Sequence, residues 1–298
     1  MRFWKFFVAS AYFLAAGSGA QPAVSGVQIQ LPAPSHADVA YADQSPLQKL
    51  DLYLPPAADG PYPVVIWIHG GGFRFGDKRS MPRKDFGPAP KAVGPDGPYQ
   101  IQVPDVGALT AKGYAVVSLN YRLDGSRSMR AATRMAIQDA KAAVRFLRAN
   151  SVKYRLDERH IAVWGNSAGG YMAAMLAATG DQQTIFDDPA LGNMDASSAV
   201  QAAVVWFGMM DERRLGEELS VTGYIRKART LPAVLVANGD VDPVVNVGAA
   251  RDLHNAFSAA GARSQLVVVP GAGHEDPLFM ATQMQPTFDF LSNALAVR

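Results

Sequence analysis

Short apolar segments recur along this chain and are separated by helical patterns. Six of them are apolar at nearly every position, which is typical of parallel strands buried on both faces. They are Val64–Ile68, Ala115–Leu119, Ile161–Trp164, Val200–Val205, Ala233–Val236 and Leu266–Val269. A seventh, Leu50–Leu54, alternates apolar and polar residues and ends at two prolines, which predicts an antiparallel strand at the sheet edge.

The clearest helical pattern runs from Met129 to Leu147, with apolar residues three or four positions apart. Strands that alternate with helices predict the α/β class, with right-handed crossovers and helices on both faces of a mostly parallel sheet of about eight strands. The length of 298 residues fits a single large domain, which we place at residues 38–298.

Two stretches interrupt this alternation. Residues 80–104 hold six prolines and three glycines and predict an irregular loop insertion. Because the loop follows an apolar strand, it falls at the ligand-binding end of the sheet, although a surface insertion without a role stays possible on the sequence alone. Residues 208–230, with Met209, Met210 and a charged segment from Glu212 to Glu218, predict a short cap.

The first twenty residues differ from the rest. Arg2 and Lys5 precede an apolar run that ends in Ser18-Gly19-Ala20, which is the pattern of a signal peptide cleaved near Ala20. A membrane anchor is the alternative, but the run is shorter than the ~20 residues of a spanning helix. We therefore expect a periplasmic or secreted protein without a stable membrane anchor, and we assign residues 21–37 to an N-terminal arm.

The composition narrows the classes of partner. A formal net charge of +2 is too small for a nucleic-acid-binding surface, and the arginines between residues 127 and 148 recur on the polar side of a helical pattern, as on a solvated face. The chain has no cysteine, which excludes disulfides, thiolate metal sites and a lipid-modified cysteine. The oligomeric state stays open.

The segment Gly165-Asn166-Ser167-Ala168-Gly169 joins an apolar strand to a helix of small residues, Tyr171 to Ala178. A Gly-x-Ser-x-Gly string between strand and helix is the nucleophile elbow, a tight turn that exposes the serine hydroxyl above the sheet. Its glycines are needed because side chains there would collide with neighbouring backbone. Ser167 is therefore the candidate nucleophile.

The segment His69-Gly70-Gly71-Gly72-Phe73 ends the strand Val64–Ile68. Backbone N–H groups of Gly71 and Gly72, together with that of Ala168, predict an oxyanion hole. Phosphate binding by this glycine run is the alternative, but neither a Gly-Lys-Ser/Thr sequence nor a spaced Gly-x-Gly-x-x-Gly accompanies it.

A serine hydroxyl needs a general base, and the chain has five histidines. His36 falls in the arm, His160 at the start of a strand, His254 in a helical pattern, and His69 opens the glycine loop. His274 remains, in a glycine-rich loop after Leu266–Val269 that places an imidazole above the sheet.

The acidic partner of this histidine has four candidates: Asp211, Asp240, Asp242 and Asp276. Asp240 and Asp242 follow the strand Ala233–Val236 and keep the order serine, aspartate, histidine. We favour Asp242, because Asp240 lies closer to the tight turn at Gly239 and is better placed to cap it.

These motifs, together with Leu50–Pro55, Gly165–Gly170, Asp240–Val245 and Gly273-His274, resemble the esterase/lipase branch of the α/β hydrolases, with feruloyl-esterase-like members closest. The resemblance covers about residues 38–296. It implies hydrolysis of carboxylic esters through an acyl-serine intermediate, without a metal or organic cofactor. Plant cell-wall acyl esters, sugar acetates and simple aliphatic esters all fit.

The chain departs from the family pattern in two places. Asn238 stands where a histidine commonly precedes the glycine, and the segment between Trp206 and Leu231 is shorter than the usual cap. Caps commonly shape the acyl pocket, so substrate size stays open. The candidates for lining that pocket, each of which fits a plain core role equally well, are Phe73, Arg74, Tyr171, Trp206 and Phe207.

The resulting hypothesis is a serine carboxylesterase that acts on small acyl, acetyl-sugar or hydroxycinnamoyl esters. Two alternatives remain. A serine peptidase of the same fold can use the same three residues, although no propeller-like repeat accompanies them. A catalytically silent binding protein on this fold would have no activated serine.

Overall fold

The computed structural model describes residues 31–56, 60–79, 104–124, 128–180, 182–209 and 215–295. The predicted signal peptide, arm residues 21–30, loop residues 80–103 and cap residues 210–214, with Asp211 among them, lie outside this part of the chain. Within the described residues, no helix is both long enough and apolar enough to cross a membrane.

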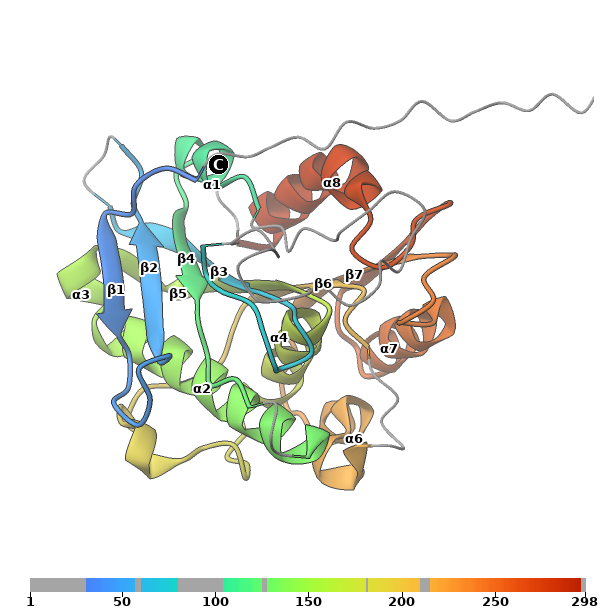
Figure 1. Cartoon of the computed structure of the whole chain (residues 1–298), viewed down its shortest axis with the longest axis horizontal. Coiled ribbons are helices and arrows are strands. Elements are labelled where there is room, and N and C mark those ends of the chain that lie inside the picture. The colour runs from blue at the N-terminus through green and yellow to red at the C-terminus, as the bar shows by residue number, and fades with distance from the viewer. Residues whose placement is uncertain are drawn as a thin grey trace, which may run out of the picture.

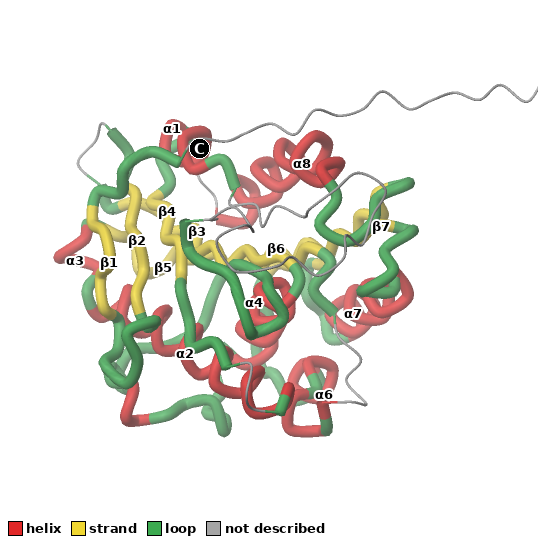
Figure 2. Tube along the Cα trace, viewed as in Figure 1, coloured by secondary structure: helices red, strands yellow, loops and turns green. Residues whose placement is uncertain are grey.

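A central sheet of eight strands confirms the predicted α/β class (Figures 1 and 2). The spatial order is β1-β2-β4-β3-β5-β6-β7-β8, and all pairs from β4 onward in this order are parallel. The strands are β1 His36–Ala40, β2 Lys49–Tyr53, β3 Tyr62–Ile68, β4 Ala115–Leu119, β5 Leu156–Asn166, β6 Ala202–Trp206, β7 Ala233–Gly239 and β8 Ser264–Val269.

The strand at the antiparallel edge is not the predicted one. β2 pairs antiparallel with β4, as its alternating pattern predicts, but β1 pairs with its other side and forms the edge. His36 therefore lies in a strand and not in an irregular arm, and the assigned arm boundary at residue 37 falls inside β1. β1 is mostly exposed, so its sequence carries little of the apolar signal that marks the inner strands.

Helices cover both faces of the sheet, as expected from the alternating pattern. In Figure 1, α1 and α8 lie on one face, and α2, α4 and α7 lie on the other. All twelve residues of α4 are buried, and its alanines and glycines let the helix approach the sheet closely. The helices are α1 Val106–Ala111, α2 Met129–Ala149, α3 Ser151–Tyr154, α4 Ala168–Thr179, α6 Val221–Ile225, α7 Val247–Ala259 and α8 Pro277–Leu295, with short 3-10 turns at Pro189–Leu191 and Glu217–Leu219.

The arginines of α2 do not all lie on a solvated face, so that interpretation of the sequence is wrong in part. Arg130 and Arg134 are exposed, but Arg145 is buried and its Nη1 lies 2.9 Å from Asp187 Oδ1. Arg148 donates from Nη2 to the carbonyl of Ala199. These two side chains hold long connections against α2, which a helical polar stripe cannot reveal.

Candidate active site

Ser167 occupies the turn between β5 and α4 in a strained backbone conformation, with φ +50° and ψ −120°. A non-glycine residue rarely adopts a positive φ unless the surrounding structure enforces it. The Ser167 N–H donates to the carbonyl of Trp206 on the neighbouring strand β6, which fixes the turn from one side. The strained serine at a strand-to-helix turn matches the predicted nucleophile elbow.

The two glycines of the elbow are explained by close backbone contacts. A Cβ on Gly169 would lie 1.9 Å from the carbonyl oxygen of Ile68, and a Cβ on Gly165 would lie 2.3 Å from Gly169. Side chains at either position would therefore push α4 away from β3 and β5. The start of α4, and with it the N–H of Ala168, is held directly above these strands.

Ser167, His274 and Asp242 lie in one hydrogen-bonded line, although they are up to 107 residues apart in sequence. His274 Nε2 is 2.9 Å from Ser167 Oγ, and His274 Nδ1 is 2.8 Å from Asp242 Oδ2. A carboxylate only accepts hydrogen bonds, so Nδ1 carries the proton and Nε2 is free to accept the serine proton. The sequence-predicted trio is thus brought together in the geometry that general-base activation of a serine needs.

Asp242 is held rigidly, and Asp240 has a different role. The Asp242 carboxylate is fully buried, and its Oδ1 accepts hydrogen bonds from the N–H groups of Val244 and Val245, both 2.8 Å. Asp240 Oδ1 accepts from the N–H of Gly271, 2.7 Å, and so ties the aspartate loop to the histidine loop. Asp242 thus contacts the imidazole, as favoured from the sequence, but Asp240 binds the histidine loop instead of capping the turn at Gly239.

The loops that carry Asp242 and His274 are fastened to each other and to their neighbours. Asp276, a candidate for the acidic partner, instead accepts from the N–H groups of Gly273 and Leu278 and so braces the histidine loop at the start of α8. Asn238, the departure from the family pattern, is fully buried and donates from Nδ2 to the carbonyl of Val245, which closes the aspartate loop.

The other histidines are placed away from this proton relay. His160 contacts Asp157, and His254 contacts Ser264. His69 is fully buried at the end of β3, where its ring stacks on Tyr121 with 4.5 Å between the ring centroids. Its Nδ1 lies 2.7 Å from the carbonyl oxygen of Gly70, so His69 is part of the packing under the glycine loop.

The glycine loop lies beside the nucleophile, as predicted for an oxyanion-binding loop. A Cβ on Gly70 would be 3.1 Å from Ser167 Cβ, and Gly71 and Gly72 adopt positive φ values of +106° and +60°. Among the described residues, none accepts a hydrogen bond from the N–H groups of Gly71 or Gly72. The assignment of these groups and of the Ala168 N–H to an oxyanion hole stays a prediction.

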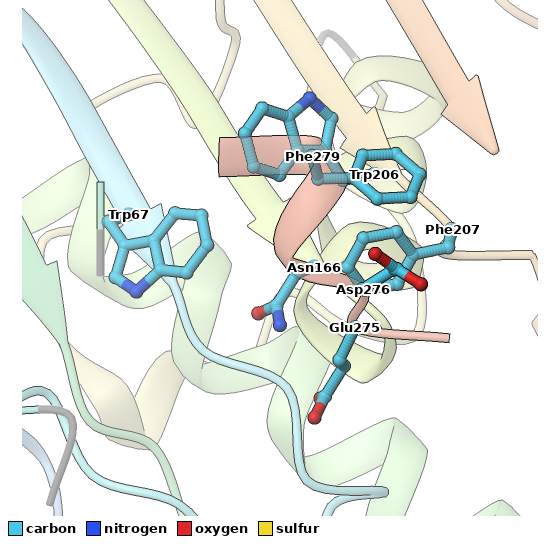
Figure 3. Close-up of a pocket in the computed structure, with 7 residues that line it drawn as sticks. All are labelled: Trp67, Asn166, Trp206, Phe207, Glu275, Asp276 and Phe279. Atoms are coloured by element: carbon cyan, nitrogen blue, oxygen red, sulfur yellow. The ribbon is translucent and has the colours of Figure 1, made fainter. Parts of the chain in front are cut away.

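The five pocket candidates separate into two groups. Phe73 and Tyr171 are fully buried and pack edge to face, with 6.5 Å between their centroids, while Arg74 in the same loop is exposed. Phe207 packs against the His274 ring at 5.1 Å, and Trp206 packs against Phe279. Trp206 and Phe207 line one small cavity, which is shown in Figure 3. All the residues that line it are Trp67, Asn166, Trp206, Phe207, Glu275, Asp276 and Phe279.

This aromatic cavity encloses about 10 Å³, which is room for about one water molecule. Trp206 and Phe207 therefore act here as packing, Trp206 against Trp164 and Phe279 and Phe207 against the imidazole of His274. Of the described residues, no group of three or more His, Cys, Asp or Glu side chains is arranged to hold a metal ion.

Burial of His69 predicts an acid-sensitive fold. Burial lowers the pKa of His69 from 6.5 to about 4, so the folded protein keeps this ring neutral where the unfolded chain takes up a proton. The unfolded state therefore binds more protons between pH 6.5 and 4, and stability falls as the pH falls through this window, by about 3 kcal/mol in total.

The corresponding measurement is urea unfolding of the wild type and of His69→Asn at pH 7 and at pH 4. We expect the wild type to lose about 3 kcal/mol more unfolding free energy than the variant between these two pH values. Equal losses in both proteins would show that His69 is not responsible for the acid sensitivity.

The fold and the hydrogen-bonded serine, histidine and aspartate place the protein among the α/β hydrolases with a serine nucleophile elbow. More specifically, the chain belongs to the BD-FAE family, whose sequence profile matches residues 50–88 and 97–218, more than half of its length. The match includes the glycine loop and the elbow, and it agrees with the esterase/lipase resemblance of the motifs.

Individual relatives support the same family. The chain is 27% identical to LipM of Mycobacterium tuberculosis, described as a probable carboxylic ester hydrolase, over 87% of this chain and 57% of the relative. It is 25% identical to the esterase LipQ of the same organism, over 88% of this chain and 62% of the relative. The chain thus spans about three fifths of the length of these curated relatives.

Solved structures share the fold. A truncated carbohydrate esterase from gut microbiota superposes with a TM-score of 0.71 at 24% identity and covers 88% of this chain and 96% of its own. An esterase of Thermogutta terrifontis with butyrate bound gives a TM-score of 0.70 at 20% identity, over 90% of this chain and 97% of its own.

The main contact that the sequence reasoning missed is that of Tyr121 with the glycine loop. Tyr121 Oη donates to the carbonyl oxygens of His69, 2.9 Å, and Gly70, 3.2 Å. The sequence did contain a signal for this contact. Asn120 and Tyr121 directly follow the strand Ala115–Leu119, and the other site residues also follow the carboxyl ends of strands.

Proposed function

We propose that this protein is a serine carboxylesterase. The observation that carries the proposal is the continuous line from Ser167 Oγ through His274 to the buried Asp242 carboxylate, at hydrogen-bond distances of 2.9 and 2.8 Å. Family membership and the esterase relatives agree with it. Export to the periplasm or the medium is part of the proposal and rests on the leader pattern of residues 1–20.

In the proposed reaction, Ser167 Oγ attacks the ester carbonyl while His274 Nε2 accepts the serine proton. The imidazolium that forms is stabilised by Asp242, and the negative charge on the substrate oxygen is stabilised by the N–H groups of Gly71, Gly72 and Ala168. His274 then returns the proton to the departing alcohol, which leaves an acyl group on Ser167. Water, activated by the same imidazole, cleaves the acyl-serine ester and releases the acid.

The proposed substrates are esters of small acyl groups, with sugar acetates and hydroxycinnamoyl esters as further members of the class. Short chains are favoured because one of the similar structures contains butyrate and another is a carbohydrate esterase. A panel of acetyl, butyryl, octanoyl and feruloyl esters, compared by kcat/KM at one pH, tests the order of preference. Faster turnover of octanoyl than of acetyl and butyryl esters would contradict it.

Covalent labelling tests the activated serine independently of the substrate. A fluorophosphonate reacts only with a serine whose proton is taken by a nearby base, so we expect one adduct per chain, located on the peptide that contains Ser167. His274→Ala should label at least about 100-fold more slowly, because general-base assistance contributes about 10²–10⁴. An unlabelled wild type would favour a silent binding protein, and an adduct on another serine would refute the assignment.

A further inference from the structure

The glycine loop is held by hydrogen bonds to its carbonyl groups. Tyr121 Oη donates to the carbonyl oxygens of His69 and Gly70, and its single hydrogen is shared between them. The next carbonyl, that of Gly71, accepts from the N–H of Arg74, 3.1 Å. The carbonyls on this side of the loop are therefore occupied by fixed donors.

These hydrogen bonds also decide where the N–H groups of the loop point. In a planar trans peptide, the carbonyl of one residue and the N–H of the next point in opposite directions. Because the carbonyl of Gly70 points toward Tyr121, the N–H of Gly71 points away from Tyr121. In the same way, the direction of the Gly71 carbonyl fixes the direction of the Gly72 N–H. Glycines at positive φ readily adopt other orientations, so the orientation of the loop depends on these hydrogen bonds. Within the loop, His69 Nδ1 lies 2.7 Å from the Gly70 carbonyl oxygen and the Arg74 N–H binds the Gly71 carbonyl, and Tyr121 adds the restraint from outside the loop.

Tyr121 is itself fixed by its neighbours. Its ring is fully buried and stacks on His69, and burial raises the pKa of its hydroxyl well above the ordinary value, so the hydroxyl remains a donor. The next residue, Arg122, donates from N and Nε to the buried carboxylate of Asp139, at 2.7 and 2.9 Å. Tyr41 Oη donates to the carbonyl of Asn120 on the other side.

The same segment also holds the far end of the glycine loop. Asn120 Oδ1 accepts from the N–H of Lys78, 2.6 Å, and Asp124 N–H donates to the carbonyl of Phe73, 3.1 Å. The Lys78 ammonium is buried and lies 2.9 Å from the buried carboxylate of Asp51 on β2. The loop is thus fastened along its length to residues 118–124 and β2.

We propose that Tyr121 is a positioning residue for the oxyanion hole: its hydroxyl turns the His69 and Gly70 carbonyls away from the nucleophile and so presents the Gly71 N–H to the reacting oxygen. This inference rests on the proposed esterase activity. It predicts that the hydroxyl contributes to transition-state binding and not to substrate binding, although it does not touch the substrate.

The test compares Tyr121→Phe with Tyr114→Phe, which changes a buried tyrosine directly before β4 and outside the glycine-loop contacts. Each variant is assayed with nitrophenyl acetate well below its unfolding midpoint, with the folded fraction measured by circular dichroism. Each variant is also titrated with a trifluoromethyl ketone, which forms an oxyanion when the serine adds to its carbonyl. The control ligand is the corresponding secondary alcohol, which has no carbonyl and forms no oxyanion.

For Tyr121→Phe we expect kcat to fall by about 10- to 100-fold, somewhat less than the ~10²–10³ for complete loss of one oxyanion donor, and KM to change by less than about twofold. The Ki of the trifluoromethyl ketone should rise by the same factor as kcat/KM falls, while the Ki of the alcohol stays constant. Tyr114→Phe should change none of these constants by more than about twofold.

Equal kcat and ketone affinity in the two variants would overturn the role of Tyr121. A wild type without esterase activity or labelling would instead refute the proposed function itself, so the two failures are distinguishable. If Tyr121→Phe does not fold, Asp139→Asn weakens the contacts that hold Arg122, and so shifts the adjacent Tyr121, while the tyrosine keeps its hydroxyl group. It should then give the same selective loss of ketone affinity, and unchanged affinity in this variant would also count against the inference.

Discussion

Replacing Ser167 with alanine should lower kcat for nitrophenyl acetate by about 10⁵-fold or more, because removal of the nucleophile disables the whole serine–histidine–aspartate unit. His274 Nε2 would lose its partner at 2.9 Å, and no acyl-enzyme could form. Residual turnover above the uncatalysed rate should come only from ester binding and from the oxyanion-binding N–H groups. Initial rates over at least an hour, at equal folded protein concentration, provide the measurement.

The control for this variant is Ser198→Ala, which removes a buried hydroxyl that lies 3.3 Å from the carbonyl of Gly180, away from the elbow. We expect Ser198→Ala to keep activity within about twofold of the wild type, since a neutral hydrogen bond contributes only ~1 kcal/mol to stability. If Ser167→Ala were as active as the wild type, Ser167 would not be the nucleophile and the proposed mechanism would be wrong.

Replacing Asp242 with asparagine should lower kcat by about 10⁴-fold. The asparagine amide can donate to His274 Nδ1, which favours the tautomer with the proton on Nε2. That tautomer cannot accept the proton of Ser167. The two N–H groups of Val244 and Val245 can still find an acceptor in the asparagine Oδ1, so the loop should keep its shape. Steady-state kinetics with nitrophenyl acetate measures the loss.

Asp240→Asn is the matched control for this substitution. Asp240 accepts one hydrogen bond from the Gly271 N–H, which an asparagine oxygen can also accept, and we expect kcat to fall by less than about tenfold. A larger effect at residue 240 than at residue 242 would show that Asp240 is the acidic partner of His274.

Much of the fold could be predicted because buried strands and amphipathic helices leave periodic patterns. The patterns of β3, β4, β5, β6, β7 and α2 predict strands buried on both faces and a helix buried on one face, and the structure confirms them. The segment Leu266–Val269 does form a strand, β8, but this strand lies at the sheet edge and is only partly buried, so the prediction that it is covered on both faces is wrong. Strand β1 was not predicted, because an exposed edge strand has no buried face and so no alternating apolar pattern. The burial of Arg145 could not be predicted for another reason: its ion-pair partner, Asp187, lies 42 residues further along the chain.

The sequence by itself determined the nucleophile, the glycine loop and the histidine, because each has a local signature: glycines where backbone segments meet, and a strand that ends directly before the functional side chain. It also determined the order of serine, aspartate and histidine. Only the tertiary structure decided that Asp242 contacts the imidazole while Asp240 binds Gly271, and that the Tyr121 hydroxyl donates to carbonyls of the glycine loop. These contacts join residues 31 to 52 positions apart, and a hydrogen bond's direction depends on three-dimensional placement, which no local pattern records.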